Sequence, residues 1–521
     1  MRVVGPSITL IGWVALLCST VARAQIGSVL ANPGWPSERP PRPLPARQVN
    51  FPPFDVRTLD NGMQVLTILH HEQPAITVRL IVGAGAAQDP QDKGGVANLV
   101  GQLLDQGTAT RSAEQIADQI DTIGGSLVTG AGADLTFANV VVMKDSFSAA
   151  MDLLLDVVRN PAFAPEEIDR QKQQAVSSLQ VSANDPNYLA SAVFDRLVYG
   201  VHPYGLPGQG TAETVAGITR EDLRRFHAVH FVPNNMILAV VGDTTPEEAL
   251  AQVQRTFGAW PKGELAPRGA IEPPVPARRI VAIDKPDSVQ TEIRVGQLAI
   301  PRKHKDYLAW DLAVRILGGE GANRLHRVLR SERGLTYGAQ ASTQAMKQAG
   351  DYMAETDTRT ETTGESLRLM VDEFAKIENQ RIFERELGDA QAFLAGSFPL
   401  TIETPNEIAT QVLNTVFYDL PVSEITTFRD RVLAVTAADV QRVAQEYVKS
   451  DRLSIVLVGN ASAFMPQLRA VGFTDVEVIP IGELDLMAPN LRRQGRPAAA
   501  GPGPASPLAD RGSSGAEPLR R

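Results

Sequence analysis

The stretches ITREDLRRFHAVHFVPNNMILAVVGD (residues 218–243) and VTAADVQRVAQEYVKSDRLSIVLVGN (residues 435–460) decide the fold. They align without a gap at an offset of 217 residues, with identical Thr, Asp, Arg and Gly at four matched positions. In each copy a threonine stands where a helix N-cap is expected, and an apolar strand ends at glycine. This match predicts an internal duplication. The alternative is that the match has no evolutionary meaning, because any helix followed by a strand gives a similar pattern.

Outward from the repeat, helical and strand patterns alternate through both halves of the chain. Asp60-Asn61-Gly62 separates two alternating runs, which is a strong hairpin signal. The segment GGVANLVGQLLDQGT, residues 94–108, has the apolar spacing of a helix. We therefore predict an α+β fold with two homologous α/β-sandwich domains of about 215 residues each, at 54–260 and 280–487.

The composition is that of a globular protein, and its charge excludes one class of partner. The chain has 521 residues, of which 43% are hydrophobic, and a formal net charge of −9. An acidic chain lacks the basic surface that grips phosphates, so no nucleic-acid partner is expected.

The N-terminus has the pattern of an export signal. An apolar run follows Arg2 and ends at Ala22-Arg23-Ala24, which resembles a cleavage site. The run is too short for a comfortable membrane span, so no stable span is expected, although an uncleaved anchor is the alternative. We predict a signal peptide at 1–24 and a periplasmic or secreted protein. Cleavage would remove Cys18, the only cysteine, and with it any disulfide.

Three further segments have compositions typical of linkers or tails. Residues 25–53 form a proline-rich leader, and 261–279 form a proline-rich linker between the two domains. Residues 488–521 are low in complexity and rich in arginine, alanine, glycine and proline, which predicts a disordered tail.

The residues themselves contain no complete catalytic constellation. The mature chain would have no cysteine nucleophile, and no G-x-S-x-G elbow occurs. A helical zinc motif needs two histidines four residues apart, and no pair has this spacing. His227 and His230, three apart, come nearest. We interpret them as a polar helix end, while a metal site built from them and His202 remains the alternative.

Several segments in order resemble the pitrilysin/insulinase-like zinc metallopeptidases, which include the mitochondrial processing peptidases. The resemblance covers about residues 54–485, nearly the whole predicted folded part. The segments are LDNGMQVL, VGAGAAQDP, KGGVANLVGQLLDQGT, HPYGLPGQGTAETV, FVPNNMILAVVGD and, in the second half, LGGEGANRLHRVLRSERGLTYGA.

The resemblance implies that the metal site is degenerate. In active members the helix matching residues 94–108 carries H-x-x-E-H, and a later glutamate completes the zinc site. Here Asn98 and Gln102 replace the histidines, Gly101 replaces the base, and Leu179 occupies the matching distal position. These residue types are poor ligands or none, so no cofactor is expected in this chain.

The resemblance also implies a retained substrate site in the second half. Active members use an arginine and a tyrosine seven residues apart to hold the peptide and support the oxyanion, and Arg330 and Tyr337 have that spacing. The alternative is a surface arginine and a half-buried tyrosine. The glycine-rich segment before them resembles one that touches substrate in noncatalytic processing-peptidase subunits, although a plain loop is equally consistent. Its glycines are Gly318, Gly319 and Gly321.

Some bacterial members divide the labour between two chains, one with H-x-x-E-H and the other with the Arg–Tyr pair. The resemblance thus implies a noncatalytic, substrate-binding subunit of an exported heterodimeric zinc peptidase. Its two domains would form half of a clamshell, its partner would be a zinc-bearing paralogue, and the substrate would be a peptide. The alternatives are a structural subunit like the respiratory core proteins, or a self-sufficient zinc protease.

Overall fold

The structure is a computed structural model and describes residues 51–265, 271–319 and 323–493. The predicted signal peptide, most of the predicted leader, Gly321 and most of the predicted tail lie outside these ranges. Among the described residues, no helix combines the length and hydrophobicity that crossing a membrane requires.

The first half is built on a six-stranded sheet with the order β1-β2-β6-β3-β5-β4. β2 and β6 run parallel, and the other neighbours are antiparallel. The strands are β1 (Phe54–Thr58), β2 (Gln64–Leu69), β3 (Ala75–Val82), β4 (Ser126–Ala131), β5 (Thr136–Met143) and β6 (Met236–Gly242). The predicted hairpin joins β1 to β2, and Gly62 adopts the positive φ of +85° that its turn requires.

The second half repeats this arrangement in the order β12-β7-β11-β8-β10-β9. Only the outermost strand differs, because β12 joins β7 in parallel whereas β1 joins β2 as an antiparallel hairpin. The strands are β7 (Arg279–Asp284), β8 (Gln290–Ala299), β9 (Ala339–Ala345), β10 (Gly350–Arg359), β11 (Ser454–Gly459) and β12 (Glu477–Pro480). The predicted α+β fold with two related halves is confirmed.

The first half contains eight α-helices in its described residues, and most of them cover one face of the first sheet. They are α2 (Val96–Leu103), α3 (Ala113–Thr122), α4 (Phe147–Arg159), α5 (Pro165–Ser182), α6 (Pro186–Tyr199), α7 (Ala212–Gly217), α8 (Arg220–His230) and α9 (Pro246–Phe257). α2, α4 and α9 pack on strands of this sheet, and α8 packs on α2. In the repeat unit, Thr219 and Thr436 both cap their helices by accepting a backbone N–H, as expected.

The second half has a corresponding set of helices around its own sheet. They are α10 (Tyr307–Gly318), α11 (Thr363–Asn379), α12 (Glu384–Ser397), α13 (Pro405–Phe417), α14 (Ser423–Thr426), α15 (Phe428–Ala434), α16 (Ala437–Tyr447) and α17 (Ala461–Ala470), with a π-helix, η5 (His326–Glu332). α10, α11 and α17 pack on strands of the second sheet, and α16 packs on α10 and α11.

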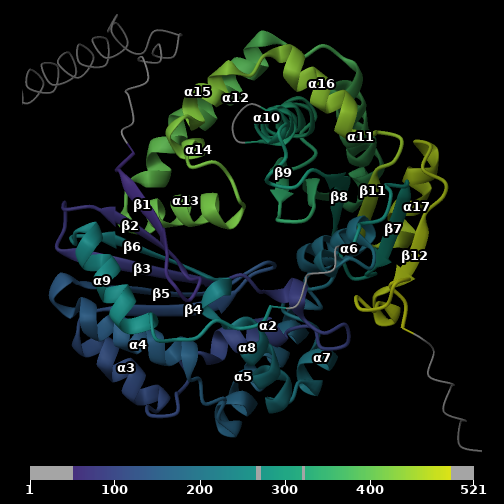
Figure 1. The fold of residues 1–521 in the computed structure, drawn as a ribbon. Coiled ribbons are helices and arrows are strands. Elements are labelled where there is room, and N and C mark those ends of the chain that lie inside the picture. The colour runs from purple at the N-terminus through teal and green to yellow at the C-terminus, as the bar shows by residue number, and fades with distance from the viewer. Residues whose placement is uncertain (1–50, 266–270, 320–322, 494–521) are drawn as a thin grey trace, which may run out of the picture. The chain divides into compact units, whose positions relative to one another are not determined.

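Each half lends one helix to the sheet of the other (Figure 1). α6 packs on β8 and β11 of the second sheet, while α13 packs on β6 and β3 of the first. Strand side chains accordingly divide between two cores: Ile280 and Ala282 face the helices of their own half, and Val281 and Ile283 face α6.

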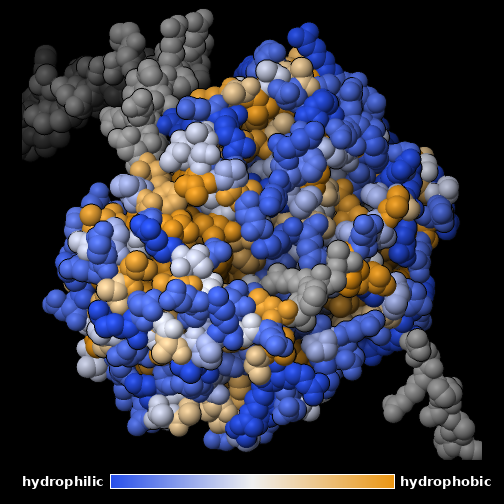
Figure 2. Space-filling model, in the orientation of Figure 1, coloured by the Kyte–Doolittle hydropathy of each residue, from blue (hydrophilic) through white to orange (hydrophobic). Residues whose placement is uncertain are grey.

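The face shown in Figure 2 is mainly hydrophilic, with hydrophobic side chains gathered where α13 lies beside the first sheet. At the C-terminal end, residues 488–493 belong to the folded unit, although the sequence places them in the tail. Arg492 forms ion pairs with Glu477 and Glu483, so the described chain is held as far as Arg493.

Candidate functional site

The helix that matches the family's zinc-binding helix is α2, and its start is firmly fixed. Asp89 accepts hydrogen bonds from the backbone N–H groups of Gly95 and Ala97, both at 2.7 Å. Burial raises the pKa of Asp89 to about 7, although these backbone hydrogen bonds oppose the shift. Asn98 and Gln102 follow on this helix and are half-buried. The helix is therefore intact, and it carries asparagine, glycine and glutamine at positions 98, 101 and 102.

Gly101 lies against β4, and this contact leaves no room for a side chain. A Cβ atom at Gly101 would lie 2.6 Å from the carbonyl carbon of Gly130. A glutamate here would push α2 away from the edge strand of the first sheet. The same relation recurs in the second half, where a Cβ at Gly318 of α10 would lie 2.2 Å from the backbone nitrogen of Ala341 on β9. Gly101 and Gly318 are separated by the 217-residue offset of the repeat.

Leu179 now belongs to the hydrophobic core of the first half. It lies on α5 with 6% of its surface exposed, and α5 packs against α2. The position that would complete a metal site is thus filled by an apolar side chain that other apolar side chains surround.

A cavity of about 360 Å³ adjoins this degenerate site. Asn98 forms part of its wall, together with Tyr188, Asp195 and Tyr204. The Tyr204 hydroxyl donates to Asp134 at 2.6 Å, and burial raises the pKa of Tyr204 far above its usual range. The pocket is therefore lined by phenols and small side chains, with one carboxyl group, and not by metal ligands.

The described residues do not fit a zinc ion. No cluster of three or more His, Cys, Asp or Glu side chains with suitable geometry occurs among them. His227 makes a hydrogen bond of 2.8 Å through Nε2 to the carbonyl oxygen of Val158, and burial lowers its pKa to about 4. His202 is fully buried, and its Nδ1 accepts from the backbone N–H of Tyr204. Each of these two imidazoles thus has one ring nitrogen engaged within the chain.

The structure brings Arg330 and Tyr337 together. Arg330 lies on η5, and its Nη1 donates to the backbone carbonyl of Tyr337 in the turn before β9. Gly334, with φ of +62°, lets the chain reverse between them. The Tyr337 side chain is 82% exposed, and Arg330 is exposed as well. The second half thus exposes an arginine whose side chain contacts the backbone of the residue that carries an exposed phenol.

A polar cavity of the second half opens beside this pair. It has a volume of about 950 Å³, and Gly318 and Gly319 at the end of α10 form part of its wall. The neighbouring Asn323 donates to the Gly319 carbonyl and accepts from the His326 backbone N–H at 2.7 Å.

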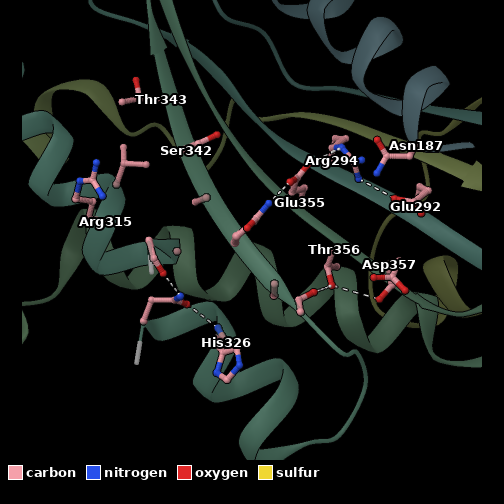
Figure 3. Close-up of a pocket in the computed structure, with 18 of the residues that line it drawn as sticks. Asn187, Glu292, Arg294, Arg315, His326, Ser342, Thr343, Glu355, Thr356 and Asp357 are labelled. Carbon is pink, nitrogen blue, oxygen red and sulfur yellow. Dashed lines mark hydrogen bonds and ion pairs between the residues drawn. The ribbon is translucent and has the colours of Figure 1, made fainter. Parts of the chain in front are cut away.

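The residues that the strands contribute to this cavity were not predicted from the sequence (Figure 3). Arg294 lies between Glu292 and Glu355, to which its Nη1 and Nε reach at 3.0 and 3.3 Å. A usable signal existed, because the strand pattern QTEIRVGQ places charged residues at alternate positions of an otherwise buried strand.

Comparison with known proteins identifies the family. A sequence profile for insulinase, peptidase family M16, matches residues 64–202, and one for the peptidase M16 inactive domain matches residues 217–394. A crystal structure from Pseudomonas fluorescens, described as a peptidase M16 inactive domain, is 31% identical with a TM-score of 0.74. It covers 78% of this chain, which in turn covers 98% of it. The chain belongs to the M16 peptidase family.

Two further proteins resemble the chain over most of its length. A protein of Mycobacterium leprae, named an uncharacterized zinc protease, is 27% identical over 67% of this chain and 79% of its own. The periplasmic protease PqqL of Escherichia coli shares the fold, with a TM-score of 0.67 and 16% identity. That match covers 84% of this chain and 51% of PqqL.

Proposed function

We propose that this chain is the noncatalytic, substrate-binding subunit of an exported heterodimeric zinc peptidase of the M16 family. The partner would be a paralogous chain that carries H-x-x-E-H and the zinc ion. One contrast carries the proposal: α2 has no metal ligands and no room for the base at Gly101, whereas Arg330 and Tyr337 stand together and exposed.

The chemistry of the exposed pair suits peptide hydrolysis in trans. When water attacks a peptide carbonyl at a zinc site, negative charge develops on the carbonyl oxygen. A phenol O–H and a guanidinium N–H are donors that stabilise such an oxyanion. Arg330 already donates one N–H to the Tyr337 backbone carbonyl, which orients the turn that carries the phenol. Tyr337 is thus the proposed donor, and Arg330 both positions it and offers further N–H groups to the peptide.

The site on this chain would act only when a partner places its zinc ion beside Tyr337. The exposure of the phenol supports this view, because an exposed large side chain is available to an approaching surface. Export rests on the predicted signal peptide, and the likeness to a periplasmic protease agrees with it.

The experiment is a hydrolysis assay on the purified complex of this chain with a zinc-bearing M16 paralogue from the same genome. Tyr337→Phe should lower kcat by about 10²-fold, the usual effect of removing one oxyanion donor. Arg330→Ala should lower kcat as well, because the turn loses its anchor. The matched control is Arg333→Ala, an exposed neighbour on the same loop that pairs with Glu365.

Three results would contradict the proposal. If the Tyr337→Phe and Arg330→Ala complexes hydrolysed peptide at the wild-type rate, the chain would be interpreted as a structural subunit. Hydrolysis by the isolated chain, sensitive to chelators, would indicate a self-sufficient protease. An equal loss with Arg333→Ala would indicate general damage to the loop and remove the case for the pair.

A further inference from the structure

The outer face of α12 carries residues that the fold of this chain does not explain. α12 packs against α10 and α15 through its buried side (Figure 1). Its exposed positions include Gly388, Ala392 and Gly396, which lie on one face because they follow one another at intervals of four residues. A Cβ atom at Gly388 or Gly396 would meet nothing within 4 Å. Glycine is unfavourable inside a helix, and no close contact within the described chain accounts for it here.

The corresponding helix of the first half, α5, has a different outer face. The two helices match at Lys172 and Gln391, because each side chain donates to two backbone carbonyls at the start of the repeat unit. Counted from this pair, Gly388, Ala392 and Gly396 correspond to Asp169, Gln173 and Ser177, all of which are exposed. The first half thus presents polar side chains to water where the second half presents small apolar residues.

Two exposed phenylalanines flank this face. Phe393 follows Ala392 on α12 and is 42% exposed, and Phe383, directly before α12, is 63% exposed. At the position that corresponds to Phe393, α5 has the exposed Gln174. Small residues beside exposed aromatic side chains are typical of a surface that another protein covers.

A cavity of about 800 Å³ beside this face contains an unsatisfied carboxylate. The two phenylalanines form part of its wall, and so does Glu373 of α11. Glu373 is 1% exposed. Its Oε1 accepts from Lys376 at 2.6 Å, whereas its Oε2 has no hydrogen-bond partner among the described residues. A buried acceptor without a donor is costly, so a donor from outside the chain is favoured there.

The basic groups of the cavity wall do not supply this donor, because each has a carboxylate partner of its own. The pairs are Arg315 with Asp311, Arg324 with Glu386, Arg327 with Glu332 and Arg385 with Asp389. The cavity therefore lacks one donor, and an ammonium or guanidinium group forms the strongest hydrogen bond to a carboxylate.

This cavity adjoins the proposed substrate site. Arg315 and Asn323 belong to its wall and also to the wall of the 950 Å³ cavity beside the turn that carries Tyr337. A chain that brings a zinc ion to Tyr337 therefore comes close to α12 as well.

We propose that the outer face of α12 is the docking surface for a helix of the zinc-bearing paralogue. The backbone of the partner helix approaches at Gly388 and Gly396, and an apolar side chain of the partner packs against Phe393. One lysine or arginine of that helix enters the cavity and donates to Oε2 of Glu373. The inference rests on the proposed function, because it names the surface that would hold that partner.

The test measures binding of the mature chain to the zinc-bearing M16 paralogue from the same genome by sedimentation velocity. Gly396→Glu should weaken binding at least about tenfold, because the new side chain occupies the space of the partner's backbone. The variant itself should fold normally, since glutamate favours a helix over glycine and its Cβ has open space. Phe393→Ala should weaken binding about tenfold, and Glu373→Gln should weaken it less.

The matched control is Ser177→Glu, which introduces the same charge at the corresponding exposed position of α5. It should leave binding unchanged. Unchanged binding with Gly396→Glu, or equal weakening by the two variants, would overturn the proposal. So would self-association of the isolated chain that Gly396→Glu abolishes, because the face would then belong to a second copy of this chain.

Failure of this inference is distinguishable from failure of the proposed function. Gly396→Glu should raise the paralogue concentration that gives half-maximal hydrolysis and leave kcat unchanged at saturation, whereas Tyr337→Phe should lower kcat and leave binding unchanged. Hydrolysis that depends on Tyr337, with binding indifferent to Gly396→Glu, would refute the docking surface alone. Binding that Gly396→Glu weakens, with hydrolysis indifferent to Tyr337, would refute the catalytic role alone. Absence of any complex would refute both.

Discussion

The hydroxyl of Tyr199 donates to the carboxylate of Asp351 at 2.7 Å, and this hydrogen bond joins the two halves of the chain. Tyr199 ends α6, and Asp351 lies on β10 of the second sheet. Asp195, one turn earlier on α6, faces the same carboxylate, and burial together with the charge of Asp351 raises the pKa of Asp195. Two carboxyl groups and a phenol are therefore buried where α6 meets the second sheet.

The buried carboxyl group of Asp351 should make the free energy of unfolding fall as the pH rises towards neutrality. Burial raises the pKa of Asp351 to about 7, from an ordinary value of 3.8. Between about pH 4 and pH 7, Asp351 keeps its proton in the folded state, whereas in the unfolded state it has released this proton. The resulting stabilisation is complete below about pH 4 and is lost as pH passes 7. Asp351→Asn removes this dependence, which is on the order of 4 kcal/mol in total.

Thermal unfolding at pH 5 and pH 8 measures this effect. The unfolding temperature of the wild type should drop more between the two values than that of Asp351→Asn. Tyr199→Phe, which keeps both carboxyl groups, should retain a pH-dependent drop. Parallel behaviour of the wild type and Asp351→Asn would show that this carboxyl group is ionised throughout.

Close contact between α2 and β4 should make Gly101→Ala destabilising. Alanine normally favours a helix over glycine by about 1 kcal/mol. Here the added methyl group would meet Gly130, so the net effect should be a loss of about 1–3 kcal/mol. The control is Gly388→Ala on α12, where a Cβ meets nothing within 4 Å. This variant should gain stability in urea unfolding; two variants that shift equally in either direction would refute the packing argument.

The carboxylate of Asp89 should stabilise the start of α2. Asp89→Ala removes two hydrogen bonds to the backbone N–H groups of Gly95 and Ala97, and should cost about 1–2 kcal/mol in chemical denaturation. Asp89→Asn retains one acceptor oxygen and should lose less. Equal stability of Asp89→Ala and the wild type would mean that water replaces the carboxylate without loss.

Restoring the two histidines should not restore a zinc enzyme. Asn98→His with Gln102→His places two imidazoles on one face of α2, but Gly101 supplies no base and Leu179 no ligand. We expect this double variant to bind zinc so weakly that mild dialysis removes it, and to hydrolyse no peptide. Elemental analysis after dialysis measures the metal, with the wild type expected near zero. Stoichiometric zinc in the wild type would contradict the degenerate site and direct attention to His227 and His230.

Local signals in the sequence predicted the fold well where one segment decides the outcome. The turn at Gly62, the helix around Asn98 and the threonine-capped repeat all follow from short-range chemistry, and all are present. The same holds for the proximity of Arg330 and Tyr337, which a seven-residue spacing and one reversing turn bring together.

Pairings between distant segments could not be predicted. The apolar strands β7 and β11 indicate burial on both faces, but no local pattern says which helix covers each face. The charged cavity depends on this choice, because Arg294 becomes buried only when α6, about a hundred residues earlier in the chain, lies over its strand. The alternating charges of Glu292 and Arg294 were the available signal for this cavity.

The exchange of α6 and α13 between the halves has a consequence for the history of the chain. A single half, cut at the linker, would leave one face of its sheet uncovered, because the helix that seals it is encoded on the other side of the cut. A one-domain ancestor with this arrangement would therefore cover both faces of its sheet only as a dimer, with each copy lending its helix to the other. Fusion of two such copies would place both exchanged helices in one chain and allow each half to diverge. One copy could lose its ligands while the other kept its arginine and tyrosine.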